Sequence, residues 1–346
     1  MAAREHLSKG ELTVLDPLAI AVRLMAVDST SGHEGEAIAL LDQMLASQGW
    51  ILTRIPVTAG RDCLLARSDD RAPSVTLSTH IDTVPPYIAP RVDGARLWGR
   101  GSCDAKGIAA AMICAAERLR ADGMPVALLF VVGEETCHDG AHAANAFAIG
   151  GRVLINGEPT ESRLALGTKG AVRCTVTVTG EAAHSAYPER GRSATMALVQ
   201  LLATLDSVAM PHDELLGAST VHIGHLAGGV ADNVIAPWAE ARLMARTVGP
   251  AEDVMALLRE WVGDRGVLTQ GPTVPAVRLG TVPGFETTIA AFATDIPALT
   301  GWGTPYLFGP GSIHVAHRDD EHIEIAELRV AVDSYVRLAH AAAGVT

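Results

Sequence analysis

The spacing of apolar residues predicts alternating strands and helices in the first 167 residues of the chain. Seven consecutive apolar residues at 126–132 lead into the adjacent carboxylates of Glu134 and Glu135. This is typical of a buried strand, although a short buried helix can have the same pattern. Apolar residues three and four positions apart predict helices at 37–45 and 106–120. Strands that alternate with helices favour a mostly parallel sheet with helices on its faces.

The pattern changes after Gly167. Residues 171–179 alternate between apolar and polar side chains, as expected of an antiparallel strand with one exposed face. Further helices and strands complete an α+β block, and a Gly/Pro-rich stretch beyond about residue 271 returns the chain to a last strand and a terminal helix. We therefore expect an α/β fold, in which 1–167 and 272–346 form a main domain with a mostly parallel sheet and 168–271 form an inserted α+β domain.

Composition limits the classes of protein that need to be considered. Hydrophobic residues make up 48% of the 346 residues and the formal net charge is -12. We expect a globular protein that binds neither nucleic acid nor an anionic membrane, since both need a basic surface. No apolar run approaches the ~18 residues of a membrane span, and charges throughout residues 1–24 argue against a signal peptide. The five cysteines include no CxxC pair, so a soluble cytoplasmic protein is expected.

Side chains that bind metals follow several predicted strands or the turns after them. They are His80, Asp82, Asp104, Glu134, Glu135, Glu158 and His317. Each alone has a structural explanation: a lone buried histidine is usually structural, Asp104 can cap a helix, and a Glu pair can be a solvated loop. Ligands of open α/β sheets, however, gather at the carboxyl ends of the strands. Two imidazoles and several carboxylates without cysteine suit a hydrolytic site with two zinc ions, with cobalt or manganese also suitable.

Short motifs in a fixed order give the sequence a resemblance to a known family. They are THIDTVPP, GRGSCDAKG, GEE, GEPT, GTKG with GEAAHSAYP, GGVADNVIAP, and FGPG with AHRDDE. Any one of them is weak, whereas the full ordered set is specific and covers nearly the whole chain. With it the sequence resembles the M20 family of metallohydrolases, the group of acetylornithine deacetylase, succinyl-diaminopimelate desuccinylase, aminoacylase and the glutamate carboxypeptidases.

The resemblance implies a role for each residue at the strand ends. His80 and Glu158 would hold one zinc ion, and Glu135 and His317 the other. Asp104 would bridge the two ions, and the peptide bond after it is expected to be cis. Glu134 would then be the free general base, and Asp82 would orient His80.

The resemblance also makes the inserted domain a lid and dimerisation domain. His184 would reach into the active site of the partner subunit of a homodimer. Asn233 and Arg246 match positions that contact substrate, the arginine as a clamp for a carboxylate. Lys169 and Tyr187 lie in matching segments and are further candidates for substrate contact.

The sequence departs from the family pattern in a few places. The family's Gly-(Ser/Thr)-Asp-Ala segment reads ATDI at 293–296, which leaves substrate contacts from that loop open. His314 lies close to His317, but the spacing after FGPG favours His317 as the ligand, and His314 is expected beside the ligands or in the core. Three other residues flank the site outside the pattern and are expected to serve packing: Cys103, Cys137 and His138.

The expected function is hydrolysis of the amide of an N-acyl amino acid, with acetylornithine deacetylase as the first comparison. Glu134 would take a proton from the attacking water and deliver it to the leaving amine. A dipeptidase or carboxypeptidase with the same site is the main alternative, because the lid loops set the substrate. A binding protein that has lost catalysis is a further alternative, since fold alone does not prove function.

Overall fold

The computed structural model describes residues 15–344, and its largest sheet has six strands in the order β1-β2-β6-β3-β7-β17. These strands are β1 (Ile51–Thr58), β2 (Arg61–Arg67), β3 (Val75–His80), β6 (Val126–Val131), β7 (Val153–Asn156) and β17 (Thr304–Leu307). The strands β3, β6, β7 and β17 are parallel to one another, while β2 is antiparallel to both β1 and β6. The predicted mostly parallel sheet is confirmed, with an antiparallel edge added.

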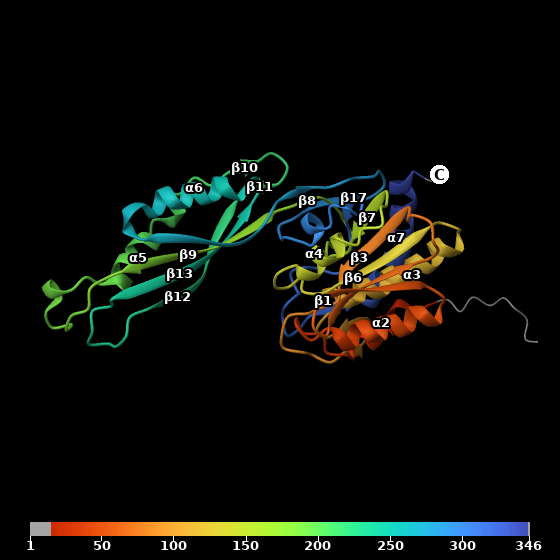
Figure 1. Ribbon diagram of the computed structural model, residues 1–346, viewed down its shortest axis with the longest axis horizontal. Coiled ribbons are helices and arrows are strands. Elements are labelled where there is room, and N and C mark those ends of the chain that lie inside the picture. Colours follow the sequence, from red (N-terminus) through yellow and green to blue (C-terminus); the bar gives the residue numbers. More distant parts are fainter. Residues whose placement is uncertain (1–14, 345–346) are drawn as a thin grey trace, which may run out of the picture.

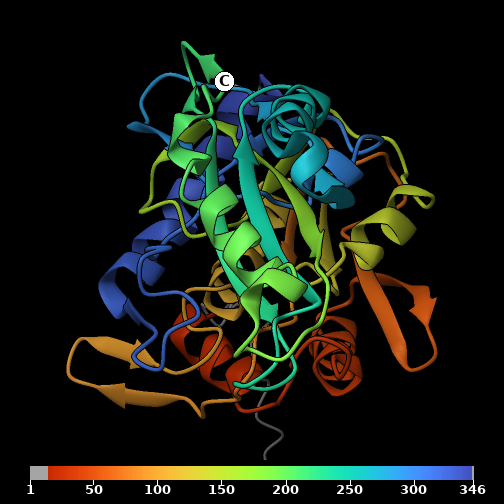
Figure 2. The same cartoon turned by 90° about the vertical axis from the view of Figure 1, so that its left-hand side faces the viewer.

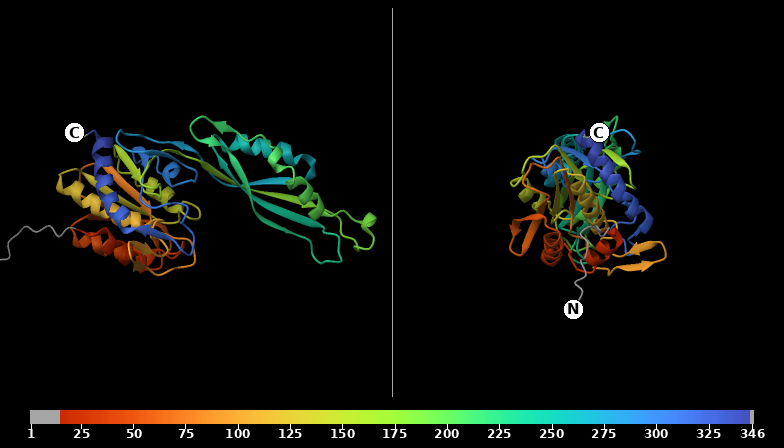
Figure 3. Two further views of the ribbon diagram at one scale, coloured as in Figure 1. Left: turned by 180° about the vertical axis from the view of Figure 1, so that it is seen from behind. Right: turned by 90° about the vertical axis from the view of Figure 1, so that its right-hand side faces the viewer.

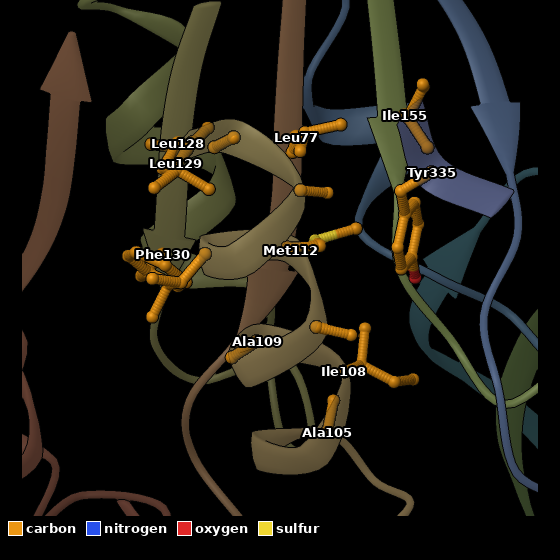
Figure 4. Close-up of a cluster of buried hydrophobic side chains, with 14 of the residues drawn as sticks. Leu77, Ala105, Ile108, Ala109, Met112, Leu128, Leu129, Phe130, Ile155 and Tyr335 are labelled. Carbon is orange, nitrogen blue, oxygen red and sulfur yellow. The ribbon is translucent and has the colours of Figure 1, made fainter. Parts of the chain in front are cut away.

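Helices cover the two central strands, β3 and β6, and bury both. Every residue of β3 and β6 is buried. The helices of this part of the chain are α1 (Pro17–Met25), α2 (Gly35–Ser47), α3 (Lys106–Ala121), α4 (Asp139–Asn145) and α7 (Ile325–Ala343). Figure 4 shows the side of α3 that carries Ile108 and Met112, with Leu77 of β3 and Tyr335 of α7 beside it. This packing fixes the start of α3, directly after Asp104 and Ala105, against the end of the sheet.

The middle of the chain forms a separate antiparallel sheet in the order β12-β13-β9-β14. Its strands are β9 (Gly170–Thr179), β12 (Thr220–Gly228), β13 (Trp238–Thr247) and β14 (Val267–Val274). The helices α5 (Ala194–Leu202) and α6 (Ala251–Val262) pack on one face of it and close a second hydrophobic core. Figures 1 and 3 show this body at one end of an elongated molecule, and Figure 2 shows the two helices lying on its sheet. We call residues 170–274 the insert.

The last strand of the insert runs past the expected boundary at residue 271. A register shift between Gln270 and Thr273 interrupts the pairing of β14 with β9, but the pairing continues to Val274. Gly and Pro at 271 and 272 hid this strand in the sequence, because both residues normally interrupt strands. The domain division at 167 and 271 stays a prediction.

Short strands complete the described part of the chain. They are β4 (Arg91–Asp93), β5 (Arg96–Trp98), β8 (Leu164–Thr168), β10 (His212–Asp213), β11 (Gly217–Ala218), β15 (Val277–Arg278), β16 (Thr287–Ala290) and β18 (His322–Glu324). The strand β8 lies between β15 and β16 and leads directly into the insert. No helix within residues 15–344 has the length and apolarity that a membrane crossing demands. Residues 1–14, for which the sequence argues against a signal peptide, lie outside the described residues.

Candidate metal centre and active site

The parallel strands of the main sheet end at one edge, and the candidate residues lie there. His80 is the last residue of β3, and Glu134 and Glu135 follow β6. Glu158 comes two residues after the end of β7, and Asp104 lies just before α3. Since parallel strands place their carboxyl ends together, segments far apart in sequence meet at this edge.

A first group of possible metal ligands consists of His80, Asp104 and Glu158. One ligand atom from each residue lies within 4.8 Å of the others, and all three residues are buried. His80 Nε2 is 3.0 Å from Asp104 Oδ1 and 4.0 Å from Glu158 Oε2. Burial and the neighbouring carboxylate of Asp104 raise the pKa of Glu158 well above its ordinary value, although His80 opposes this.

A second group shares Asp104 and adds Glu135 and His317. Its ligand atoms also lie within 4.8 Å of one another. His317 Nε2 is 3.1 Å from Asp104 Oδ2 and 3.1 Å from Glu135 Oε1. Hydrogen bonds to these two carboxylates raise the pKa of His317 to about 10. Asp104 thus turns one carboxylate oxygen toward each histidine, and the peptide bond between it and Ala105 is cis, as expected.

The possible ligands do not satisfy one another's hydrogen-bonding groups completely, and a bound cation would. Glu158 Oε1 is buried and has no hydrogen-bond partner among the described residues. A buried carboxylate oxygen without a partner is unfavourable, and a divalent cation would satisfy it. His80 Nδ1 faces the backbone carbonyl of Asp82 at 2.9 Å, so Nδ1 is a donor and Nε2, which faces Asp104, is the ring atom that could bind a cation.

The contact between Asp82 and His80 differs from the predicted one. The carbonyl of Asp82, rather than its carboxylate, makes the hydrogen bond to His80, because the carboxylate oxygen Oδ1 lies 3.6 Å away. The carboxylate instead accepts the backbone N–H of Glu134 at 3.1 Å and that of Glu135 at 3.2 Å. It also accepts the Ser31 hydroxyl at 2.7 Å. Asp82 therefore holds the turn that carries the glutamate pair.

Glu134 lines the same cavity but belongs to neither group of possible ligands. Burial raises the pKa of Glu134 well above its ordinary value, and repulsion from Glu158 adds to this. A carboxyl group with a raised pKa beside a group of possible metal ligands is suited to accepting and returning a proton.

The cavity around these residues has a volume of about 520 Å³ and is closed on one side by the insert. Arg246 of β13 lines that side, and its role as a clamp for a carboxylate stays a prediction. Lys169 does not line the cavity, because its ammonium group donates to the carbonyl of Ala218 at 2.6 Å.

The remaining candidates lie at the other end of the insert. His184 and Asn233 belong to the loops after β9 and after β12, and the backbone N–H of Ser185 donates to the carbonyl of Asn233 at 3.0 Å. Tyr187 packs edge-on to His184 and is 58% exposed. Figure 1 shows these loops at the end of the insert farthest from the main sheet, so one chain does not bring His184 to its own strand-end cluster.

The structure also corrects the sequence interpretation of several flanking residues. His138 and Cys137 were expected to serve packing, but both line the cavity. His138 Nδ1 lies 2.8 Å from Asp295 Oδ1, which gives the ATDI segment a place beside the site. His314 is exposed, and so is not in the core. Arg173 also lines the cavity. Its only signal in the sequence is that it occupies a polar position in the alternating segment 171–179.

Comparisons with known proteins show the family of the chain. Residues 76–341 match Peptidase family M20/M25/M40. A probable carboxypeptidase of Aspergillus fumigatus is 36% identical over 92% of this chain and 85% of that protein. A tripeptidase of Staphylococcus aureus has a similar fold, with 18% identity and a TM-score of 0.81 over 97% of this chain and 100% of that one.

A second solved structure has the same fold. The YXEP protein of Bacillus subtilis, described as a dinuclear metal binding peptidase, is 16% identical with a TM-score of 0.70 over 93% of this chain and 96% of that one. Because the family match spans most of the chain and a relative is 36% identical over 92% of it, the chain belongs to peptidase family M20/M25/M40 and is a hydrolase of amide or peptide C–N bonds.

Proposed function

We propose that the protein is a dimetal hydrolase that releases an amino acid with a free α-carboxylate from an N-acyl or N-aminoacyl amide. Zinc is the metal that we expect, with cobalt or manganese as functional substitutes. One observation carries the proposal: Asp104 presents Oδ1 to His80 at 3.0 Å and Oδ2 to His317 at 3.1 Å. A carboxylate with an imidazole at each oxygen is the arrangement that two neighbouring cations require of a bridging ligand.

The proposed ligands divide between two positions. His80 and Glu158 would hold one cation, and Glu135 and His317 would hold the other, with Asp104 between them. When bound, the two cations would acidify water and attract the oxygen of the amide carbonyl. Glu134 would take the proton of the attacking water and return it to the leaving nitrogen.

Other residues of the chain would bind and enclose the substrate. Arg246 can hold a carboxylate with two parallel hydrogen bonds, which a lysine cannot match. His184 and Asn233 lie far from the strand-end cluster of their own chain, which supports a homodimer whose partner supplies them. The cysteines at 63, 103, 114, 137 and 174 are all unpaired, which supports work in a reducing compartment such as the cytoplasm.

The part of the substrate on the acyl side separates a deacylase from a peptidase. The sequence resemblance favoured acetylornithine deacetylase, whereas the relative with 36% identity is named a probable carboxypeptidase. Both reactions release an amino acid whose α-carboxylate Arg246 would bind. We therefore propose carboxypeptidase activity first and deacylation of N-acetyl amino acids as the second activity.

Amino acid release from two matched substrate sets tests this function. The metal-loaded protein is given dipeptides and N-acetyl amino acids with the same C-terminal residues, and the free amino acid is measured. We expect release from at least one set and a loss of about 10²-fold or more in the Glu134→Gln variant, with its metal content kept. No release from either set, or a Glu134→Gln variant with the wild-type rate, would contradict the proposal.

A further inference from the structure

Two arginines of the insert face the cavity from neighbouring strands. Arg173 lies on β9 opposite Met244, and Arg246 lies on β13 opposite Ala171. Directly paired residues of an antiparallel sheet share a face, as do residues two positions apart on one strand. The two guanidinium groups therefore leave the same face of the sheet, and both line the cavity next to Glu134.

The opposite face of these strands is occupied by the core of the insert. Val172 and Cys174 of β9 and Ala245 of β13 are buried against α5 and α6. This alternation fixes the direction of Arg173 and Arg246, because a side chain cannot change face without a shift in strand register.

Neither arginine has an acidic partner among residues 15–344. No ion pair and no side-chain hydrogen bond of Arg173 or Arg246 is formed with any described residue, although Arg242, on the same strand and face, pairs with Glu240 at 3.1 Å. The carboxylates that line the cavity are Asp104, Glu134, Glu135 and Glu158, which belong to the strand-end cluster. Burial lowers the pKa of Arg246 and repulsion from Arg173 adds to this, whereas attraction from Glu134 opposes it.

Two neighbouring cations that are not directly paired with an acid form a binding site for negative charge. A single carboxylate is satisfied by one guanidinium in the bidentate geometry. The second arginine thus remains available for a second anionic group on the same substrate. The other residues of the insert that line the cavity are uncharged and include Met244, Pro272 and Thr273, so the insert itself supplies no acid to the pair.

We propose that Arg173 and Arg246 together select a substrate whose released residue carries two carboxylates, as in a C-terminal glutamate or aspartate. Arg246 binds the α-carboxylate and Arg173 binds the side-chain carboxylate. This specificity rests on the proposed function, because the residue held by the arginines is the one that hydrolysis releases.

Paired substrates that differ by one charge test the role of Arg173. Ala-Glu is compared with Ala-Gln, and N-acetyl-glutamate with N-acetyl-glutamine, which have nearly the same shape. We expect the wild-type protein to favour the glutamate member by at least about 10-fold in kcat/KM. Arg173→Gln should bring this ratio close to one through KM rather than kcat, and Arg173→Lys should keep part of the preference.

The control variant is Arg242→Gln. It removes a positive charge that lies on the same strand and face as Arg246 but outside the cavity. It should keep the wild-type ratio, which separates a local contact from a change in net charge. Equal kcat/KM for the two members of each pair in the wild-type protein would overturn the inference. A ratio that Arg173→Gln leaves unchanged would also overturn it.

A binding measurement distinguishes failure of this inference from failure of the proposed function. Calorimetry with the metal-loaded Glu134→Gln variant compares N-acetyl-glutamate with N-acetyl-glutamine without turnover. Tighter binding of the glutamate compound, lost on adding Arg173→Gln, supports the inference even if no substrate is hydrolysed, and only the proposed function then fails. Equal binding of both compounds overturns the inference even if hydrolysis is observed.

Discussion

At the scale of single residues, Asp82 connects the two halves of the proposed chemistry. Its backbone carbonyl accepts a hydrogen bond from His80, and its carboxylate accepts the backbone N–H groups of Glu134 and Glu135. Burial raises the pKa of the Asp82 carboxyl, but the nearby His80 ring, the Ser31 hydroxyl and the backbone N–H of Glu135 outweigh this and leave it lowered. The group is therefore a charged acceptor that fixes both a possible ligand and the proposed base.

The Asp82→Asn variant should lose activity although its backbone carbonyl remains. One of the two N–H donors then faces an amide nitrogen, which leaves a buried donor unpaired and loosens the turn. We expect a loss of about 10-fold to 100-fold in kcat/KM or metal affinity, measured by hydrolysis assays and metal titration. Ser31→Ala removes only one hydrogen bond to the carboxylate and should have a much smaller effect. Equal losses in both variants would count against this role.

Protonation of His317 makes metal binding depend on pH. The pKa of His317 is raised to about 10 in the metal-free protein, so its ring is protonated at neutral pH. A cation needs the neutral ring, and binding must release that proton. The affinity for zinc should thus rise with pH, by up to about 10-fold per unit for each proton released.

Zinc titrations at pH 6, 7 and 8 measure this dependence. His317→Ala should weaken zinc binding and make the slope against pH shallower. His314→Ala, which removes an exposed histidine outside both groups of ligands, should leave the slope unchanged. A zinc affinity that does not change with pH would show that zinc binding does not displace a proton from His317.

The sequence predicted which residues belong to the candidate site where the side chain closely follows a strand. The glutamate pair could be placed at a sheet edge because the apolar run of β6 comes before it, and His80 because Val75, Thr76 and Leu77 favour a strand before it. Which atom makes a contact was not predictable, as the carbonyl of Asp82 shows. The pairing of His138 with Asp295 joins residues 157 positions apart and has no local signal.

At the scale of elements, the start of α3 positions Asp104. Gly107 lies in the first turn of α3, and a Cβ there would lie 2.1 Å from the backbone oxygen of Ser102. This contact involves backbone rather than a flexible side chain, so the loop before the helix would have to move.

Gly107→Ala should therefore destabilise the protein although alanine favours helices. We expect a loss of about 1–3 kcal/mol in the free energy of unfolding, measured by chemical denaturation, together with weaker metal binding. Gly249→Ala is the control, because its nearest contact would be at 4.0 Å and it should change stability by less than about 0.5 kcal/mol. A Gly107→Ala protein with wild-type stability would refute the close contact.

Long elements with clear periodicity were predictable, and short ones were not. The predicted helix at 106–120 and the alternating strand at 171–179 agree with α3 and β9 to within one residue at each end. The strands β10, β11 and β15 have two residues each, too few for any period to appear. Tertiary contacts rather than local sequence determine such pieces.

At the scale of the whole molecule, the distance between the ends of the insert makes the proposed active site a shared one. Arg246 lies at the end of the insert next to the main sheet, whereas His184 lies at the opposite end. Two variants, His184→Ala and Glu134→Gln, should each be nearly inactive alone. Mixed and allowed to exchange subunits, they should regain about a quarter of wild-type activity, because half of the dimers are mixed and each has one intact site. A mixture as inactive as its parts would contradict a partner's His184 in the site.

The central claim is that side chains from separate strand ends hold two metal ions with Asp104 between them. Anomalous X-ray diffraction from crystals grown with zinc tests it most directly. We expect two peaks about 3.5–4 Å apart, one in contact with His80, Asp104 and Glu158 and the other with Asp104, Glu135 and His317. Peaks at other residues, or a fully loaded crystal with no peak beside Asp104, would contradict the account.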